Sequence, residues 1–119
     1  MLVTVPDAAL EALMASPVML RRVWPSGYEE AMMLIHVLRV ATPSLADALV
    51  LGLITMLSPA SRQVTAEVTL AFRAAALTAV ARGTGGQRIT APHTRAGEVI
   101  RLDVTDLVVA GRSCLGMTG

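Results

Sequence analysis

The chain has 119 residues with ten basic and nine acidic side chains, and its formal net charge is +1. This balance gives no overall positive field for a nucleic acid or a membrane surface, so neither partner is expected. Hydrophobic residues make up 54% of the chain and charged residues 16%, whereas about 25% of an ordinary soluble domain is charged. The length predicts a single domain over residues 1–119, and the excess of apolar residues predicts a homodimer or a homotetramer.

The residue types that bind metals or form disulfides are scarce. The single Cys114 leaves no intramolecular disulfide and no multi-cysteine metal site. Histidine and acidic residues show no metal-ligand spacing, so no metal and no cofactor is expected. Residues 1–7 lack the basic stretch that begins a secretory signal, and the longest uncharged apolar run, residues 48–57, is about half a membrane span. We therefore expect a cytoplasmic protein.

The N-terminal third predicts one clear helix and two ambiguous segments. Pro6 followed by Asp7 and Glu11 is typical of a helix start, which predicts a helix over residues 6–15 that stops at Ser16-Pro17. Residues 18–24 have the content of a strand. Residues 29–40 are mostly apolar, and their periodicity fits a buried strand or a helix; we favour a strand.

A long apolar helix is predicted over residues 43–57. Thr42 supplies a capping oxygen, Pro43 suits the first helical position, and Ser58-Pro59 ends the segment. Asp47 is the only ionisable side chain in this helix. A charge on a helix without a polar face has to reach solvent, find a partner or take part in chemistry, so Asp47 is the leading functional candidate.

The pattern then changes to the two-residue period of β-strands. Alternating apolar residues predict strands whose order suggests an antiparallel sheet. Asp106 marks a turn or a bulge between the last two strands, and the polar segment 87–97 is predicted to be a long hairpin loop. The predicted strands are residues 64–73, 77–82, 100–105 and 107–117.

Three short segments resemble the hotdog-fold thioesterases, in particular the small acyl-CoA thioesterases of the phenylacetate type. They are Leu45-Ala46-Asp47-Ala48, the strand from residue 64 that closes with Phe72-Arg73-Ala74, and Val104-Thr105-Asp106 followed by Gly111-Arg112. The resemblance covers roughly residues 28–117. It implies an α+β, hotdog-like fold in which a curved antiparallel sheet wraps around one central apolar helix, about residues 43–57.

The resemblance also implies a reaction and its residues. In that family an acidic residue on the central helix acts as general base or nucleophile toward a thioester, which assigns catalysis to Asp47, with His36 as the counterpart of the family histidine. The helix start near Thr42 and Ser44 would polarise the carbonyl group. Phe72 and Arg73 would line the acyl site, and Arg88 in the loop would bind the phosphates of an acyl-CoA substrate.

Other functions stay open beside hydrolysis. Residues 38–40, Leu-Arg-Val, stand where the family has His-Gly-Gly, which favours a non-catalytic member of the fold that binds an apolar or acyl ligand or serves in assembly. A third alternative is a cone-shaped α+β ligand-binding fold of the nuclear-transport-factor type. Asp47 would then be a carboxylate stabilised by the helix dipole, His36 a core histidine, and the pair Met32-Met33 either pocket lining or core filling.

Overall fold

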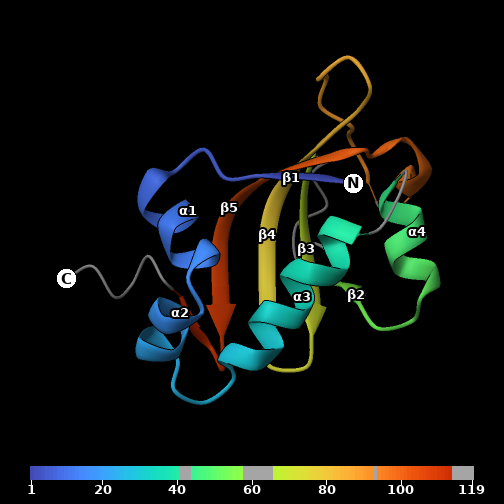
Figure 1. Cartoon of the computed structure of the whole chain (residues 1–119). Coiled ribbons are helices and arrows are strands. Elements are labelled where there is room, and N and C mark those ends of the chain that lie inside the picture. The colour runs from blue at the N-terminus through green and yellow to red at the C-terminus, as the bar shows by residue number, and fades with distance from the viewer. Residues whose placement is uncertain (41–43, 58–65, 93, 114–119) are drawn as a thin grey trace.

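The computed structural model describes residues 1–40, 44–57, 66–92 and 94–113, and it confirms an α+β protein. The elements in chain order are β1 (Leu2–Thr4), α1 (Ala8–Ala15), α2 (Pro17–Val23), α3 (Tyr28–Val40), α4 (Leu45–Val50), β2 (Thr55–Leu57), β3 (Glu67–Phe72), β4 (Ala75–Arg82), the 3-10 helix η1 (Ala96–Glu98), β5 (Arg101–Val109) and β6 (Arg112–Ser113). The sheet order is β1-β5-β4-β3-β2, with β6 paired to β5. Strand β1 runs parallel to β5, the other neighbours are antiparallel, and α3 crosses one face of the sheet (Figure 1).

The first two helices meet at a single serine. The predicted helix at residues 6–15 is confirmed as α1, whose N-cap Asp7 accepts a hydrogen bond from the N–H of Leu10 at 2.9 Å. Ser16 ends α1 and also caps α2, where its hydroxyl accepts from the N–H of Met19. The strand expected over residues 18–24 is therefore wrong. Ser16-Pro17 stops one helix, and it also supplies the N-cap and first residue of the next.

Residues 28–40 form helix α3, so the strand favoured for residues 29–40 is wrong. Glutamates in the first turn suit the positive end of the helix dipole, and the segment is rich in residues with high helix propensity. Gly27, with a φ of +100°, precedes the helix, and its carbonyl accepts from the N–H groups of Glu30 and Ala31. A Cβ atom at Gly27 would lie 2.7 Å from a methyl group of Val109, so a larger residue is excluded there.

The long helix expected over residues 43–57 is also wrong. Helix α4 covers only Leu45–Val50, Gly52 has a φ of +73°, and Thr55–Leu57 is already strand β2. Glycine in the left-handed region ends helices readily. Residues 41–43 and 58–65, which include the expected Thr42 cap and the Ser58-Pro59 stop, lie outside the described residues. No single long apolar helix is present in the described part of the chain, and the helix that lies on the sheet is α3.

The predicted strands after residue 66 are largely confirmed. In β3, Val68 and Leu70 are buried, and β4 alternates buried and half-buried side chains along its whole length. Residues 101–109 form one continuous strand, β5, rather than two. The expected irregularity near Asp106 is a bulge, because the register against β4 shifts between Thr78 and Ala79. Residues 114–117 of the last predicted strand, including Cys114, lie outside the described residues.

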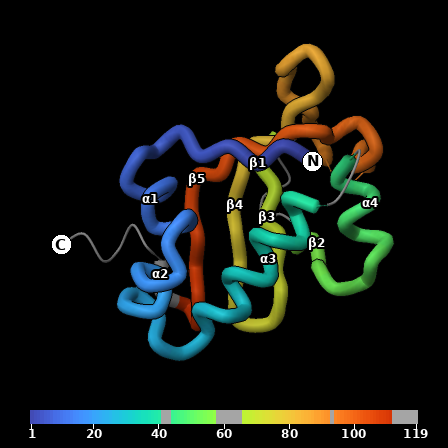
Figure 2. The backbone as a smooth tube through the Cα atoms, in the orientation of Figure 1, coloured from blue at the N-terminus to red at the C-terminus, as the bar shows by residue number. Residues whose placement is uncertain are grey.

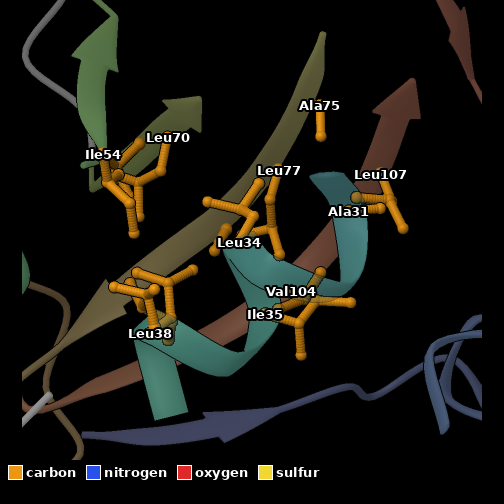
Figure 3. Packing of buried hydrophobic residues seen from close by; sticks show 14 of the residues in the cluster. Ala31, Leu34, Ile35, Leu38, Ile54, Leu70, Ala75, Leu77, Val104 and Leu107 are labelled. Atoms are coloured by element: carbon orange, nitrogen blue, oxygen red, sulfur yellow. The ribbon is translucent and has the colours of Figure 1, made fainter. Parts of the chain in front are cut away.

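The core lies between α3 and the sheet. Leu70 on β3 pairs with Leu77 on β4, which pairs with Leu107 on β5, and all three side chains are fully buried. Helix α3 turns its buried residues toward this row, as Figure 3 shows. These residues are Ala31, Leu34, Ile35, Val37 and Leu38. Their helical spacing fixes which face of α3 meets the sheet.

A second cluster, made of charged groups, ties three strands together. The Asp103 carboxylate on β5 accepts hydrogen bonds from Arg82 on β4 at 2.6 Å, from Arg101 at 3.0 and 3.1 Å, and from the hydroxyl of Thr4 on β1. Burial by itself raises the pKa of Asp103, but these hydrogen bonds outweigh it and lower the pKa to about 2. Arg82 also donates to the carbonyl of Gly86 at 3.0 Å, which holds the loop after β4.

Candidate functional site

The outward face of α3 carries apolar side chains that the sheet does not cover. Glu29, Met32, Met33 and His36 recur at the spacing of one helix face and are all exposed. Met32 is 37% exposed and Met33 45%, whereas Leu34, next in the chain, is fully buried. Helix α3 therefore has a buried apolar face and a second face with two methionines, which the described residues leave exposed.

Two adjoining hollows follow this outward face. The larger, about 510 Å³, lies between the start of α3 and the turn that joins β3 to β4, which run close together in Figure 2. The smaller, about 340 Å³, lies further along α3. Both are lined by Glu29 and Met33, so they adjoin, and we call the two hollows together the α3 groove. Its lining residues are Pro25, Gly27, Tyr28, Glu29, Glu30, Met32, Met33, His36, Phe72 and Arg73.

The turn between β3 and β4 is held against α3 and forms one wall of the groove. The Glu30 carboxylate on α3 accepts a hydrogen bond from the N–H of Ala74 at 2.6 Å. Arg73 has a φ of +54°, which is uncommon for a residue with a side chain. Its guanidinium carbon lies 5.4 Å from the centre of the Phe72 ring, a cation–π contact. The groove is therefore built before any ligand arrives.

The groove combines aromatic, thioether and acidic groups. Tyr28 and Phe72 are two of only three aromatic residues in the chain. The described lining of the larger hollow holds two carboxylates, those of Glu29 and Glu30, and one guanidinium, that of Arg73, so carboxylates outnumber guanidinium groups there. The smaller hollow is mostly apolar, and the larger one mixes polar and apolar groups. This combination is suited to an apolar group that carries a positive charge, because the apolar part can be buried while the charge stays near the carboxylates.

The structure brings together three of the predicted site residues and separates a fourth. Phe72 and Arg73 line the larger hollow, and His36 lines the smaller one. Arg88 forms an isolated β-bridge with Arg82, at the opposite end of β4 from the groove. The intervening length of β4 spans roughly 24 Å, so Arg88 does not contribute to this site.

Asp47 is the third residue of α4 and forms a capping box with the N-cap residue Ser44. Its Oδ2 accepts hydrogen bonds from the N–H of Ser44 at 2.9 Å and from the Ser44 hydroxyl at 3.0 Å, and Ser44 is itself buried. The N–H of Leu45 donates to the carbonyl of Val99 at 2.8 Å, which holds α4 beside η1. Figure 1 shows α4 near the C-terminal end of α3, whereas the groove is at the N-terminal half. The structure therefore does not bring Asp47 to the groove, and Thr42 lies outside the described residues.

Substitution Asp47→Ala is expected to destabilise the fold by about 1 kcal/mol, because it removes the acceptor for both Ser44 donors. Asp47→Asn keeps an acceptor oxygen, so it is expected to lower the stability of the fold by less than Asp47→Ala does. Urea denaturation of the two variants measures the difference. Equal stability of Asp47→Ala and the parent would contradict the capping role.

Sequence reasoning missed the acidic part of the groove. Glu29 and Glu30 fall at the start of the segment for which a strand is favoured, and a strand would not place Glu29 on one face with Met32, Met33 and His36. Glu29, Met32, Met33 and His36 follow the i, i+3, i+4, i+7 spacing, and that spacing is the signal that identifies one helix face.

Comparisons of the chain with protein-family models, with curated proteins and with solved structures find no match. Among the described residues no group of three or more histidine, cysteine or acidic side chains is arranged to hold a metal ion. In the same part of the chain no helix has the length and apolar character needed to cross a membrane.

Proposed function

We propose that this protein is a non-catalytic binding module that holds an apolar, positively charged ligand in the α3 groove. The observation that carries the proposal is the exposed stripe of Glu29, Met32, Met33 and His36, on a helix whose other face is fully buried. Exposed apolar surface that is continuous and bordered by polar groups is characteristic of binding sites. Methionine side chains are flexible and polarisable, which suits a surface that adapts to its ligand.

The charges of the groove select the ligand's polar end. Glu29 is exposed, and Glu30 keeps its carboxylate at the groove while it accepts from the Ala74 N–H. An ammonium or guanidinium group would be attracted to these two carboxylates. A carboxylate ligand would meet them as like charges, and Arg73 is the one guanidinium among the described lining residues. Alkyl and aryl cations share the required chemistry, as do arginine or lysine side chains that are flanked by apolar residues.

Thioester hydrolysis on a hotdog-like fold is the second candidate. A helix that crosses a largely antiparallel sheet, with Phe72 and Arg73 beside it, supports this candidate. The helix in question is α3 rather than residues 43–57, and Asp47 is engaged with Ser44. A water-activating base at the groove would therefore have to be Glu29, Glu30 or His36.

Two probes with the same apolar chain and opposite charge test the binding proposal. We expect n-octylammonium to shift the methyl NMR signals of Met32 and Met33 in protein that is labelled at the methionine methyl groups and diluted until it is monomeric, so that no second molecule covers the groove. Octanoate should bind about tenfold more weakly because its carboxylate faces two acidic side chains. The methyl signal of Met14, which is buried in the core, is the internal control. Equal affinity for the two probes would contradict the charge selection, and a shift confined to Met14 would contradict the site.

A panel of short, long and aromatic acyl-CoAs separates binding from hydrolysis. The binding module predicts no thiol release above the uncatalysed background. Thiol release that disappears in Asp47→Asn would instead establish the thioesterase function and assign its base to Asp47. Release that disappears in Glu29→Gln would place hydrolysis in the α3 groove.

A further inference from the structure

We propose that the natural occupant of the α3 groove is helix α2 of a second copy of this chain. The two copies form a symmetric dimer in which each α2 packs antiparallel against the partner's α3. This proposal rests on the binding function proposed above and names the ligand.

Helix α2 has the chemistry that the groove selects. Its Leu20 is buried and anchors it to the core, whereas Val18 is 62% exposed and Met19 43% exposed. Arg21 and Arg22 in its last turn are exposed as well. Within the described part of the chain neither arginine belongs to a salt bridge. Helix α2 therefore presents two apolar side chains followed by two guanidinium groups to solvent.

The order of these groups fixes the direction of packing. Along α2 the apolar pair Val18 and Met19 comes first and the arginines follow. Along α3 the acidic residue Glu29 comes first and the pair Met32 and Met33 follows. The apolar side chains of α2 can face those of α3, and its arginines can face the acidic residue of α3, only if the two helices run in opposite directions. Arg22 would then face Glu29 of the partner subunit, and Met19 would face the partner's methionines.

A second copy satisfies this pairing in a way that the same chain does not. Helix α2 is joined to α3 by residues 24–27, and the two helices lie next to each other (Figure 1). The buried Leu20 side of α2 faces its own core, which leaves the arginine side directed away from it. A two-fold axis repeats the same contact twice, so one interface uses both exposed surfaces of each copy. The low fraction of charged residues, 16%, agrees with a chain that buries apolar surface on association.

A charge exchange tests the pairing. Sedimentation velocity at micromolar concentration is expected to show a dimer for the parent. Glu29→Arg and Arg22→Glu should each raise the dimer Kd about tenfold or more, since each places like charges opposite one another twice. The double variant Glu29→Arg/Arg22→Glu should return the Kd to within about threefold of the parent. An equimolar mixture of the two single variants should form a heterodimer equally well, because both of its contacts then pair opposite charges.

The controls keep the test decisive. Glu11→Arg changes the same charge on the exposed face of α1 and should leave the Kd unchanged. Glu29→Gln and Arg22→Gln each remove one charge without reversing it, and each should weaken the dimer. They replace Glu29→Arg and Arg22→Glu if circular dichroism shows that the charge-reversal variants are unfolded. A parent that stays monomeric, or a dimer that all these variants leave unchanged, would overturn the proposal. If octylammonium still shifts Met32 and Met33 in that case, the binding function stands and only the identity of the occupant fails.

Discussion

Replacement of Leu34 by alanine is expected to lower the free energy of unfolding by about 3 kcal/mol. Leu34 is fully buried and extends from α3 toward Leu77 on β4, as Figure 3 shows. Truncation removes its apolar contacts and leaves a cavity that the surrounding sheet and helix can only partly fill. Urea denaturation followed by far-ultraviolet circular dichroism measures the loss directly.

The neighbouring residue provides the matched control. Met33 precedes Leu34 but is 45% exposed in the α3 groove, so Met33→Ala is expected to change the stability of the monomer by no more than about 0.5 kcal/mol. The comparison is made at a concentration where the protein is monomeric. If the two alanine variants lose the same stability, α3 does not meet the sheet through the face that contains Leu34.

The cluster around Asp103 is expected to make the fold sensitive to acid. The pKa of Asp103 is lowered to about 2 in the folded protein from an ordinary value of 3.8. A lowered pKa means that the folded state favours the ionised carboxylate, so its contribution is complete above about pH 4 and is lost as the pH falls toward 2. The shift corresponds to a contribution on the order of 2 kcal/mol. Because Arg82 and Arg101 donate to the carboxylate, protonation removes two charge-assisted contacts at once.

A pH series of unfolding free energies, recorded for the parent and for Asp103→Asn, measures this contribution. The stability difference between the two proteins should be largest near neutral pH and should shrink between about pH 4 and pH 2. Glu98→Gln is the control. Its hydrogen bond with Arg95 also lowers the pKa of Glu98, but solvent screens this exposed pair, so the variant should stay close to the acid dependence of the parent. A stability difference that stays constant through the acid range would contradict the role of Asp103.

The strands after residue 66 were predictable because their pattern is local, whereas β1 and β2, with three residues each, are too short to show one. Val68 and Leu70 alternate with polar neighbours, and such alternation has no helical equivalent. An irregularity at Asp106 was also predicted, but it was expected to separate two strands, and the structure has one continuous strand there. Strand β5 continues through the bulge because the neighbouring strand β4 is long enough to pair with the residues before and after it.

The helices were harder to predict because the sequence offers more than one residue that could cap each helix end, and the boundaries depend on which of them does so. Ser44 and Asp47 form a capping pair that starts α4, and Gly52 ends the helical conformation only a few residues later. Thr42-Pro43 was an equally good start from sequence alone. In α3 the exposed Met32 and Met33 made residues 29–40 look apolar on all sides, which hid the helical period that separates its buried face from its outward face.

The candidate site followed from the sequence only in part. Phe72, Arg73 and His36 were singled out, and they line the α3 groove. Their connection to Glu29 and Glu30 depends on the turn after β3 meeting the start of α3, a contact between residues more than forty positions apart. Periodicity carries no information about such a contact, so the acidic wall of the groove became visible only in the folded chain.

The most direct test of the groove as a docking surface is the methyl spectrum of the methionines as the protein is diluted. We predict that the signals of Met32 and Met33 move with concentration as the partner's α2 leaves the groove, while the buried Met14 keeps its position. The signal of Met19 on α2 should move over the same concentration range. Signals of Met19, Met32 and Met33 that stay fixed from the dimeric to the monomeric concentration range would contradict the proposed interface.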